Sequence, residues 1–177
     1  MEKMYQTIRT KNFFDNPYEI IEYSKSLKFY EPDKSKSNQG WPGLRTESLH
    51  MINPKLFSTV LQKVLSYYFI NKDYTITARL YFHKSNKETS LNYNKINSIH
   101  TDFEAKIAGL IYLNDDNDIN SGTTLYDQNN KETVIFSNSF NTMISYDANE
   151  KHGPTSLEKD RLTMPFFIEK IERNNNA

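Results

Sequence analysis

The sequence predicts a mainly β protein with flanking helices, built as a jelly roll that is braced by N-terminal α-helices. Three observations lead to this prediction. Two amphipathic helical segments, each opened by an Asn-Pro pair, occupy the first third of the 177 residues. From about residue 74 the hydrophobic period changes to two, and short strand patterns then alternate with turns. Aromatic residues make up 14% of the chain and only five residues are glycine, a composition that suits strand packing.

The two helical segments are predicted from their start signals and their apolar spacing. In each, an Asn suits the N-cap and the following Pro suits the first helical position, at 16–17 and at 53–54. Apolar residues then recur at helical spacing, which gives each segment one face to bury. These residues are Ile20, Tyr23 and Leu27 in the first segment, and Phe57, Val60, Leu61, Val64 and Leu65 in the second.

The strands are predicted from alternation and from short apolar runs between turns. Segment 74–83 has an apolar face and a polar face, whereas segment 105–113 is apolar on both faces, as expected for a central strand. The polar composition of segment 84–97 predicts a mobile loop. The two faces of 74–83 are Ile76, Ala78, Leu80 and Phe82 on one side, and Thr77, Arg79, Tyr81 and His83 on the other.

Length and composition predict one domain over 1–177. Its expected parts are a helical support region over 1–73, a β core over 74–169 and a tail over 170–177, of which 172–177 is expected to fray. Lys and Arg total 22 and Asp and Glu total 22, so no net charge favours nucleic acid. No apolar run has the length of a membrane span and no signal peptide is apparent, so we expect a cytoplasmic protein that uses neither membrane nor nucleic acid. The absence of cysteine excludes zinc–thiolate sites and cysteine nucleophiles.

The sequence His100-Thr101-Asp102 stands at the start of the most apolar strand. In an extended segment, side chains two residues apart project to the same side, so His100 and Asp102 could share a metal ion. A solvated loop with Asp102 in a turn explains the same triplet. His152 follows a predicted strand, and as a third ligand it would complete a 2-His-1-carboxylate triad, the arrangement of non-haem Fe(II) oxygenases.

A second pattern follows His152 on the last predicted strand. Arg161 and Thr163 project to the same side, and a guanidinium beside a hydroxyl suits a carboxylate. A surface salt bridge explains Arg161 alone. The joint occurrence of His-x-Asp, a distal His and Arg-x-Thr makes coincidence the weaker explanation.

These motifs resemble those of the 2-oxoglutarate- and Fe(II)-dependent oxygenase superfamily, and most closely its prolyl 4-hydroxylase-like branch. His100-Thr101-Asp102 is similar to the first ligand pair, His152 to the distal ligand and Arg161-Leu162-Thr163 to the co-substrate motif. "GLIYLNDDNDINSGTTLY" also resembles the strand of this branch that ends in Tyr-Leu-Asn. The chain departs from the branch at Ser121-Gly122, where Gly-Gly is usual, and in a longer segment before His100.

The resemblance implies a double-stranded β-helix, a cupin-like jelly roll, with two cofactors. Fe(II) would bind His100, Asp102 and His152, which would also be the catalytic residues. The far carboxylate of 2-oxoglutarate would bind Arg161, Thr163 and Tyr112, with Tyr81 near the co-substrate. The implied reaction uses O₂, hydroxylates a peptidyl (prolyl-type) or small-molecule substrate and releases succinate and CO₂. The residues implied at the cofactors are His100, Asp102, His152, Tyr112, Arg161, Thr163 and Tyr81.

Two other functions stay open at this point. A non-catalytic jelly-roll binding module would keep the fold without the chemistry, and a zinc hydrolase would use the triad with a bound water. The segment 31–47 contains Trp41 and Arg45 in a turn-rich context. One interpretation of this segment is that Trp41 packs on the core. The alternative is a substrate-facing edge of the site, in which Trp41 forms an apolar wall and Arg45 binds an acidic group.

Overall fold

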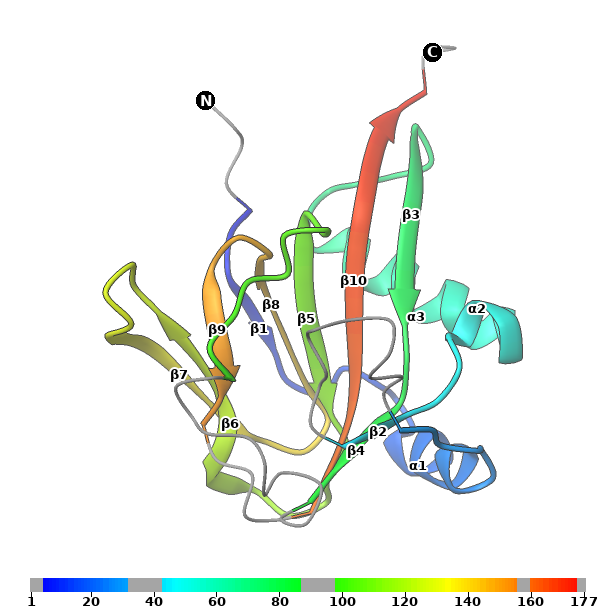
Figure 1. Cartoon of the computed structure of the whole chain (residues 1–177). Helices are drawn as coiled ribbons and strands as arrows, with labels where there is room; N and C mark the ends of the chain where they lie inside the picture. The colour runs from blue at the N-terminus through cyan, green and yellow to red at the C-terminus, as the bar shows by residue number, and fades with distance from the viewer. Residues whose placement is uncertain (1–4, 32–42, 87–97, 156–159, 175–177) are drawn as a thin grey trace.

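A computed structural model of the chain describes residues 5–31, 43–86, 98–155 and 160–174. Within these residues the fold is mainly β, with two antiparallel sheets as in a jelly roll (Figure 1). The helices are α1 (Pro17–Lys25), α2 (Leu49–Ile52) and α3 (Pro54–Ser66). The strands are β1 (Ile8–Thr10), β2 (Leu44–Arg45), β3 (Tyr74–Leu80), β4 (His83–Ser85), β5 (Ile107–Tyr112), β6 (Asp118–Tyr126), β7 (Glu132–Asn138), β8 (Thr142–Asp147), β9 (Lys151–Pro154) and β10 (Arg161–Arg173).

The larger sheet has the strand order β1-β8-β5-β10-β4-β2, and β3 pairs with the far part of β10. The smaller sheet has the order β7-β6-β9. β10 is the longest described strand, and it pairs with β3, β4 and β5. Figure 1 shows α1, α2 and α3 grouped on one side of the molecule, away from β6, β7 and β9.

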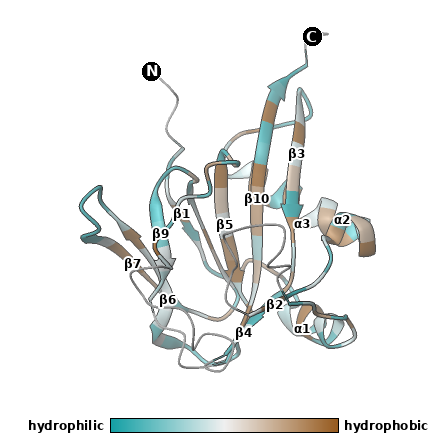
Figure 2. Cartoon of the chain, viewed as in Figure 1, coloured by the Kyte–Doolittle hydropathy of each residue, from teal (hydrophilic) through white to brown (hydrophobic). Residues whose placement is uncertain are grey.

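The central strand β5 is buried on both of its faces, as its sequence predicts. Ile107 and Ile111 enter a core cluster that also contains Val60 and Val64 of α3. Tyr112, on the opposite face, enters a second cluster that is shared with the smaller sheet. Figure 2 shows the contrast between hydrophobic β5 and the hydrophilic turn that joins β6 to β7. The metal motif therefore adjoins a strand that is enclosed by protein on both sides.

The N-terminal third is less purely helical than predicted. β1 pairs with β8 and β2 pairs with β4, so residues from 1–73 extend the larger sheet at two edges. Strands of three and two residues are too short to show a hydrophobic period, which is why the sequence pattern misses them. The Asn53 side chain caps α3 by accepting a hydrogen bond from the backbone N–H of Leu56 at 3.0 Å. Asn16 forms no such side-chain bond to the described residues.

The predicted fraying of 172–177 is wrong for its first two residues. β10 continues to Arg173, which pairs with Tyr74 at the start of β3, after an irregularity between Ile168 and Lys170. The backbone groups of this segment are satisfied by β3, so its polar side chains reflect an exposed strand rather than a frayed end.

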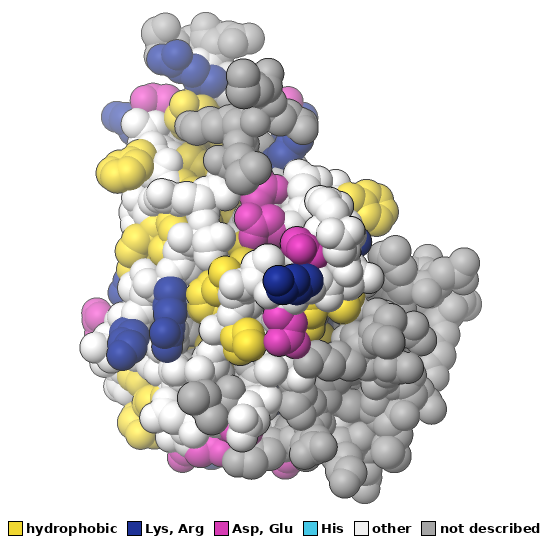
Figure 3. All heavy atoms as spheres, turned by 90° about the vertical axis from the view of Figure 1, so that its left-hand side faces the viewer, with side chains coloured by type: hydrophobic (Ala, Val, Ile, Leu, Met, Phe, Trp, Pro, Cys, Tyr) yellow, Lys and Arg dark blue, Asp and Glu magenta, His cyan; other side chains and the backbone are white. Residues whose placement is uncertain are grey.

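The chain surface shows no segregation of charge on the face drawn in Figure 3. Basic, acidic and hydrophobic side chains are intermixed over the described residues of this face. This distribution agrees with the equal numbers of acidic and basic residues. None of the described helices combines the length and the apolar character that crossing a bilayer requires.

Phe82 gives a direct test of the helix-side core. Its side chain is fully buried, and its ring lies 6.1 Å from that of Tyr23 in α1. We expect Phe82→Ala to lower the free energy of unfolding by roughly 3–5 kcal/mol, because a buried ring is replaced by a cavity. Phe69→Ala is the matched control, since Phe69 is 89% exposed, and we expect a change within about 0.5 kcal/mol. Urea denaturation measures both, and equal effects would contradict the assigned core.

Candidate metal centre

The fold brings together three side chains that are far apart in the sequence. His100, Asp102 and His152 each offer one ligand atom, and these three atoms lie within 4.8 Å of one another. The Nε2 atom of His152 lies 3.2 Å from one carboxylate oxygen of Asp102, and the Nε2 atom of His100 lies 3.7 Å from the other. Both ring nitrogens and the carboxylate therefore point toward one shared point, as ligands of a single ion do.

Backbone hydrogen bonds hold the two ligand segments in register. The backbone N–H of His100 donates to the carbonyl of His152 at 2.9 Å, and the N–H of His152 donates back at 2.8 Å. The N–H of Asp102 donates to the carbonyl of Ala148 at 2.9 Å. Gly153 permits this close approach, because a Cβ there would lie 2.9 Å from the carbonyl oxygen of Ser98. The triad is thus fixed by main-chain pairing and does not depend on the side chains alone.

The tautomers of both histidines follow from their second ring nitrogen. Nδ1 of His100 lies 2.7 Å from the carbonyl oxygen of Ser98, and Nδ1 of His152 lies 2.9 Å from that of Glu150. A carbonyl oxygen only accepts, so each Nδ1 must carry the proton and donate it. A bound metal ion would take the lone pair of each Nε2, with the Nδ1–H held by a backbone carbonyl as in metal-ligating histidines.

Burial and neighbouring groups shift the pKa values of two members of the triad, His100 and Asp102. His100 keeps 49% of its side-chain surface exposed, yet desolvation by the surrounding protein and the charge of His152 lower its pKa. Burial acts to raise the pKa of Asp102, but the hydrogen bond from His152, followed by the charges of His152, His100 and Arg45, brings that pKa below its ordinary value. A neutral His100 and an ionised Asp102 are the protonation states that a metal ion requires.

The donor set fits a non-haem Fe(II) ion. Two imidazoles and one carboxylate form the ligand set of the facial triad, which leaves coordination positions open for other ligands. The exposure of the three side chains rises from 6% at His152 to 18% at Asp102 and 49% at His100. The centre is therefore anchored in the protein at His152 and opens toward the side of His100.

A buried cationic cluster lies between the two sheets. Tyr112 is fully buried and its hydroxyl donates to Oγ1 of Thr123 at 2.9 Å. The guanidinium of Arg161 also donates to this oxygen, at 3.3 Å, and lies 5.3 Å from the centre of the Tyr112 ring. Burial raises the pKa of the Tyr112 hydroxyl, which keeps it a neutral donor, although the Arg161 charge acts in the opposite direction. The Arg161–Thr123–Tyr112 cluster therefore combines a positive charge with hydroxyl donors.

Arg161 retains an unused donor in this cluster. Its Nε atom is buried and has no hydrogen-bond partner among the described residues. A buried guanidinium with an unpaired N–H is costly unless an anion completes it. The far carboxylate of 2-oxoglutarate is such an anion, so the cluster fits this co-substrate. Thr163 is buried and lies directly opposite Tyr112 in the β10–β5 pair, which places its hydroxyl on the same face.

Asn114 positions the start of β10 and with it Arg161. Its side-chain oxygen accepts from the backbone N–H of Leu162 at 2.9 Å, and its side-chain nitrogen donates to the carbonyl of Asp160 at 2.9 Å. These two bonds hold the residues immediately before and after Arg161. The Tyr-Leu-Asn sequence thus supplies both Tyr112 and the residue that orients the arginine.

Tyr146 links the metal triad to the cationic cluster. It is 3% exposed, and its ring centre lies 4.6 Å from that of His152. Burial raises the pKa of its hydroxyl well above the ordinary value, with a further contribution from Asp102, while Arg161 acts in the opposite direction. Its ring and neutral hydroxyl therefore form part of the wall between the two sites.

Two of the remaining predicted residues, Tyr81 and Arg45, pack against each other. Tyr81 packs against Phe167, with ring centres 6.5 Å apart, and the Arg45 guanidinium lies 5.7 Å from the centre of each ring. The role of Tyr81 toward the co-substrate stays a prediction, since its ring contacts are with Arg45 and Phe167. Trp41 and the greater part of the 84–97 loop lie outside the described residues.

Thr123, Asn114 and Tyr146 are site residues that the sequence reasoning does not assign. Thr123 and Asn114 lie within the quoted segment that resembles the family, so their neighbourhood gives a signal. Tyr146 carries no motif. Tyr146 is positioned by the pairing of β8 with β5, in which it lies opposite Ala108.

Comparisons with known proteins agree with this geometry at the level of the fold. No family model and no curated protein matches the sequence. A 2OG-Fe(II) oxygenase family oxidoreductase from Burkholderia pseudomallei is similar in structure, with a TM-score of 0.60, 12% identity and coverage of 97% of this chain and 87% of that chain. A prolyl hydroxylase from Trichoplax adhaerens, solved with a hypoxia inducible factor peptide fragment, is similar with a TM-score of 0.61 and 14% identity. The match covers 92% of this chain and 83% of that chain.

A third similar structure is HygX from Streptomyces hygroscopicus, solved with nickel and 2-oxoglutarate bound. It gives a TM-score of 0.62 at 12% identity and covers 96% of this chain and 83% of that chain. At 12–14% identity these similarities establish a shared fold. The chain has the fold of the 2OG-Fe(II) oxygenases, prolyl hydroxylases included.

Proposed function

We propose that the protein is an Fe(II)- and 2-oxoglutarate-dependent dioxygenase that hydroxylates a peptidyl or small-molecule substrate. The observation that carries this proposal is the conjunction of two sites in one fold. The His100–Asp102–His152 triad offers a metal site, and the Arg161–Thr123–Tyr112 cluster offers a buried anion site. Tyr146 is in contact with the first and electrostatically coupled to the second.

Each residue has a defined task in this proposal. Bound Fe(II) and 2-oxoglutarate would supply the oxidative chemistry that consumes O₂ and releases succinate and CO₂. His100, Asp102 and His152 hold the metal, with both imidazoles oriented by their Nδ1–H donors. Arg161, together with the hydroxyls around it, binds the far carboxylate and fixes the direction of the co-substrate. The enclosed hydrophobic clusters on both faces of β5 exclude water.

An anaerobic titration tests the proposal directly. Protein loaded with Fe(II) and then mixed with 2-oxoglutarate should develop the weak visible charge-transfer band of the chelate. Admission of O₂ should convert 2-oxoglutarate to succinate, at least slowly, without an added substrate. The absence of both the band and succinate would refute the proposal.

The zinc hydrolase and the non-catalytic binding module give other results. A zinc hydrolase leaves the buried Arg161 cluster without a purpose, and it predicts zinc as the metal retained after purification. A binding module predicts that neither Fe(II) nor 2-oxoglutarate raises the melting temperature. Metal analysis and thermal shifts with each ligand separate the three functions.

His152→Ala should abolish iron retention. The substitution removes the most deeply buried ligand, and two ligands with an exposed imidazole hold Fe(II) weakly. His50→Ala is the matched control, because His50 is an exposed histidine on α2 that hydrogen bonds to Ser48. Iron content per protein after desalting is the measurement. Equal iron content in the two variants would contradict the assignment.

Arg161→Gln should weaken 2-oxoglutarate binding while leaving iron in place. Loss of a charge-assisted pair should raise the dissociation constant roughly 10- to 100-fold, or about 1.5–3 kcal/mol. Thr123→Val should show a smaller loss in the same direction, because it removes only the hydroxyl that Arg161 and Tyr112 share. The amplitude of the chelate band against 2-oxoglutarate concentration measures both. Arg173→Gln, an exposed change at the end of β10, should leave the binding curve unchanged.

A further inference from the structure

Tyr146 projects into the space between the two sheets. Along β8 the side chains alternate, so that Met143 enters the core cluster on the helix side, whereas Ile144 and Tyr146 enter the cluster shared with the smaller sheet. Ser145 turns to the helix side, where its hydroxyl lies 2.6 Å from that of Tyr68. Tyr146 therefore lies on the inner face of the larger sheet, which is the face that carries the site.

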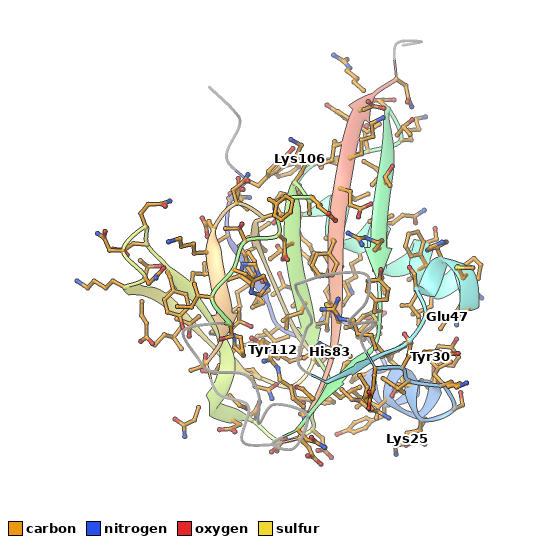
Figure 4. The ribbon with its side chains drawn as sticks, viewed as in Figure 1. Lys25, Tyr30, Glu47, His83, Lys106 and Tyr112 are labelled. Carbon is orange, nitrogen blue, oxygen red and sulfur yellow. The ribbon has the colours of Figure 1, made fainter. Side chains whose placement is uncertain are left out.

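Strand β8 runs from the cationic cluster to the metal triad. It begins opposite Tyr112, at the end of β5 that the cluster occupies. Just beyond its other end, the carbonyl of Ala148 accepts from the backbone N–H of the ligand Asp102 at 2.9 Å, and the N–H of Ala148 donates to the carbonyl of Lys106 at 3.2 Å. Figure 4 shows Lys106 and Tyr112 at opposite ends of β5. Tyr146 is two residues before Ala148, so it lies between the two sites and nearer to the metal triad.

The ring of Tyr146 packs on one of the metal ligands. Its centre lies 4.6 Å from the centre of the His152 ring, and the two ring planes are inclined by 49°. Nε2 of His152 lies 3.2 Å from the carboxylate of Asp102, which marks the point that the triad shares. The ring of Tyr146 is thus held beside the metal position.

Tyr146 offers a hydrogen-bond donor where its neighbours on the inner face offer none. These neighbours in the β8–β5 pair are Ile144, Leu110 and Ala108, and all three are apolar. A buried tyrosine hydroxyl usually has a hydrogen-bond partner. Among the residues that the structure describes, none is hydrogen-bonded to the hydroxyl of Tyr146. An enclosed hydroxyl without a partner gains most from a ligand oxygen that accepts its proton.

We propose that the hydroxyl of Tyr146 donates a hydrogen bond to the 2-oxo acid end of 2-oxoglutarate, which makes Tyr146 a further co-substrate residue. The inference rests on the proposed oxygenase function and deepens it. The cationic cluster holds the far carboxylate at one end of β8, and Tyr146 holds the 2-oxo acid end beside the metal triad. The oxygens of an ionised 2-oxo acid only accept hydrogen bonds, and a bond from a hydroxyl to a carboxylate is of the strong, charge-assisted kind.

Tyr146→Phe isolates the hydroxyl, because the ring that packs on His152 stays in place. Tyr126→Phe is the matched control, since Tyr126 is also buried and its hydroxyl also has no partner among the described residues. Tyr126 lies opposite Lys151 in the β6–β9 pair, whereas its neighbour Leu125 lies opposite His152. Adjacent residues of a strand project to opposite faces, so Tyr126 points away from the metal ligand.

The experiment compares the full-length variants with the wild type by iron content after desalting and by anaerobic titration with 2-oxoglutarate. Tyr146→Phe should retain the iron, raise the dissociation constant of 2-oxoglutarate roughly tenfold and shift the maximum of the chelate band. The shift is expected because the lost hydrogen bond ends on the chelating group itself. Arg161→Gln should raise the dissociation constant without this shift, because it acts at the far carboxylate. Tyr126→Phe should change none of the three quantities.

Three results for Tyr146→Phe would overturn the inference. An unchanged dissociation constant, or one that rises equally in Tyr126→Phe, leaves the hydroxyl without a role at the co-substrate. A higher dissociation constant without a shift of the band maximum places the hydroxyl away from the 2-oxo acid end. Loss of iron would mean that the hydroxyl supports the metal ligands instead. Melting temperatures close to that of the wild type show that both variants fold.

The wild-type protein separates this inference from the function on which it rests. If the wild type forms the chelate and Tyr146→Phe gives one of these three results, the role of Tyr146 alone is refuted. If the wild type forms no chelate, the oxygenase function is refuted, and the inference is refuted with it.

Discussion

The pairing of β10 with β5 is the constraint on which the rest of the structure depends. Its register aligns Thr163 with Tyr112 at one end and Ile168 with Ile107 at the other. Because side chains alternate along a strand, this register sends one set of residues to the helix-side core and the other set to the space between the sheets. A shift of one residue would exchange the two sets, and Arg161 would then leave the site.

The burial of Arg161 depends on the protein that encloses the space between the two sheets. A guanidinium in a protein interior is stable only when donors and charges are matched, and Thr123 satisfies one of the N–H groups of Arg161. The unpaired Nε atom leaves the cluster incomplete in the described residues. In the proposed function an anionic co-substrate would complete it, and the energy of burying the charge would be recovered when that ligand binds. The same burial makes the carboxylate–guanidinium interaction stronger than it would be in water.

Much of the site could be predicted from the sequence, because its motifs lie on extended segments. The spacing of His100 and Asp102, and of Arg161 and Thr163, places each pair on one side of a strand regardless of the rest of the fold. The apolar run over 105–113 likewise predicts a strand that is buried on both faces. Thr123 and Tyr146 could not be assigned in this way, since their roles come from pairing between distant strands. The edge strands β1 and β2, and the extension of β10 to Arg173, depend on their partners for the same reason.

One row of opposed residues runs across the larger sheet from Arg45 through His83 and Thr163 to Tyr112, and its two ends differ in rigidity. At Tyr112 the row lies in the centre of the larger sheet, between β10 and β8, where both neighbours fix the backbone. At Arg45 it reaches β2, a strand of two residues at the edge of the sheet. Sequence changes at an edge disturb fewer backbone bonds than changes in a central strand. The Tyr112 end is thus tied to the stability of the fold, whereas the Arg45 end can change at a lower cost to it, as is usual for the edges of a rigid scaffold.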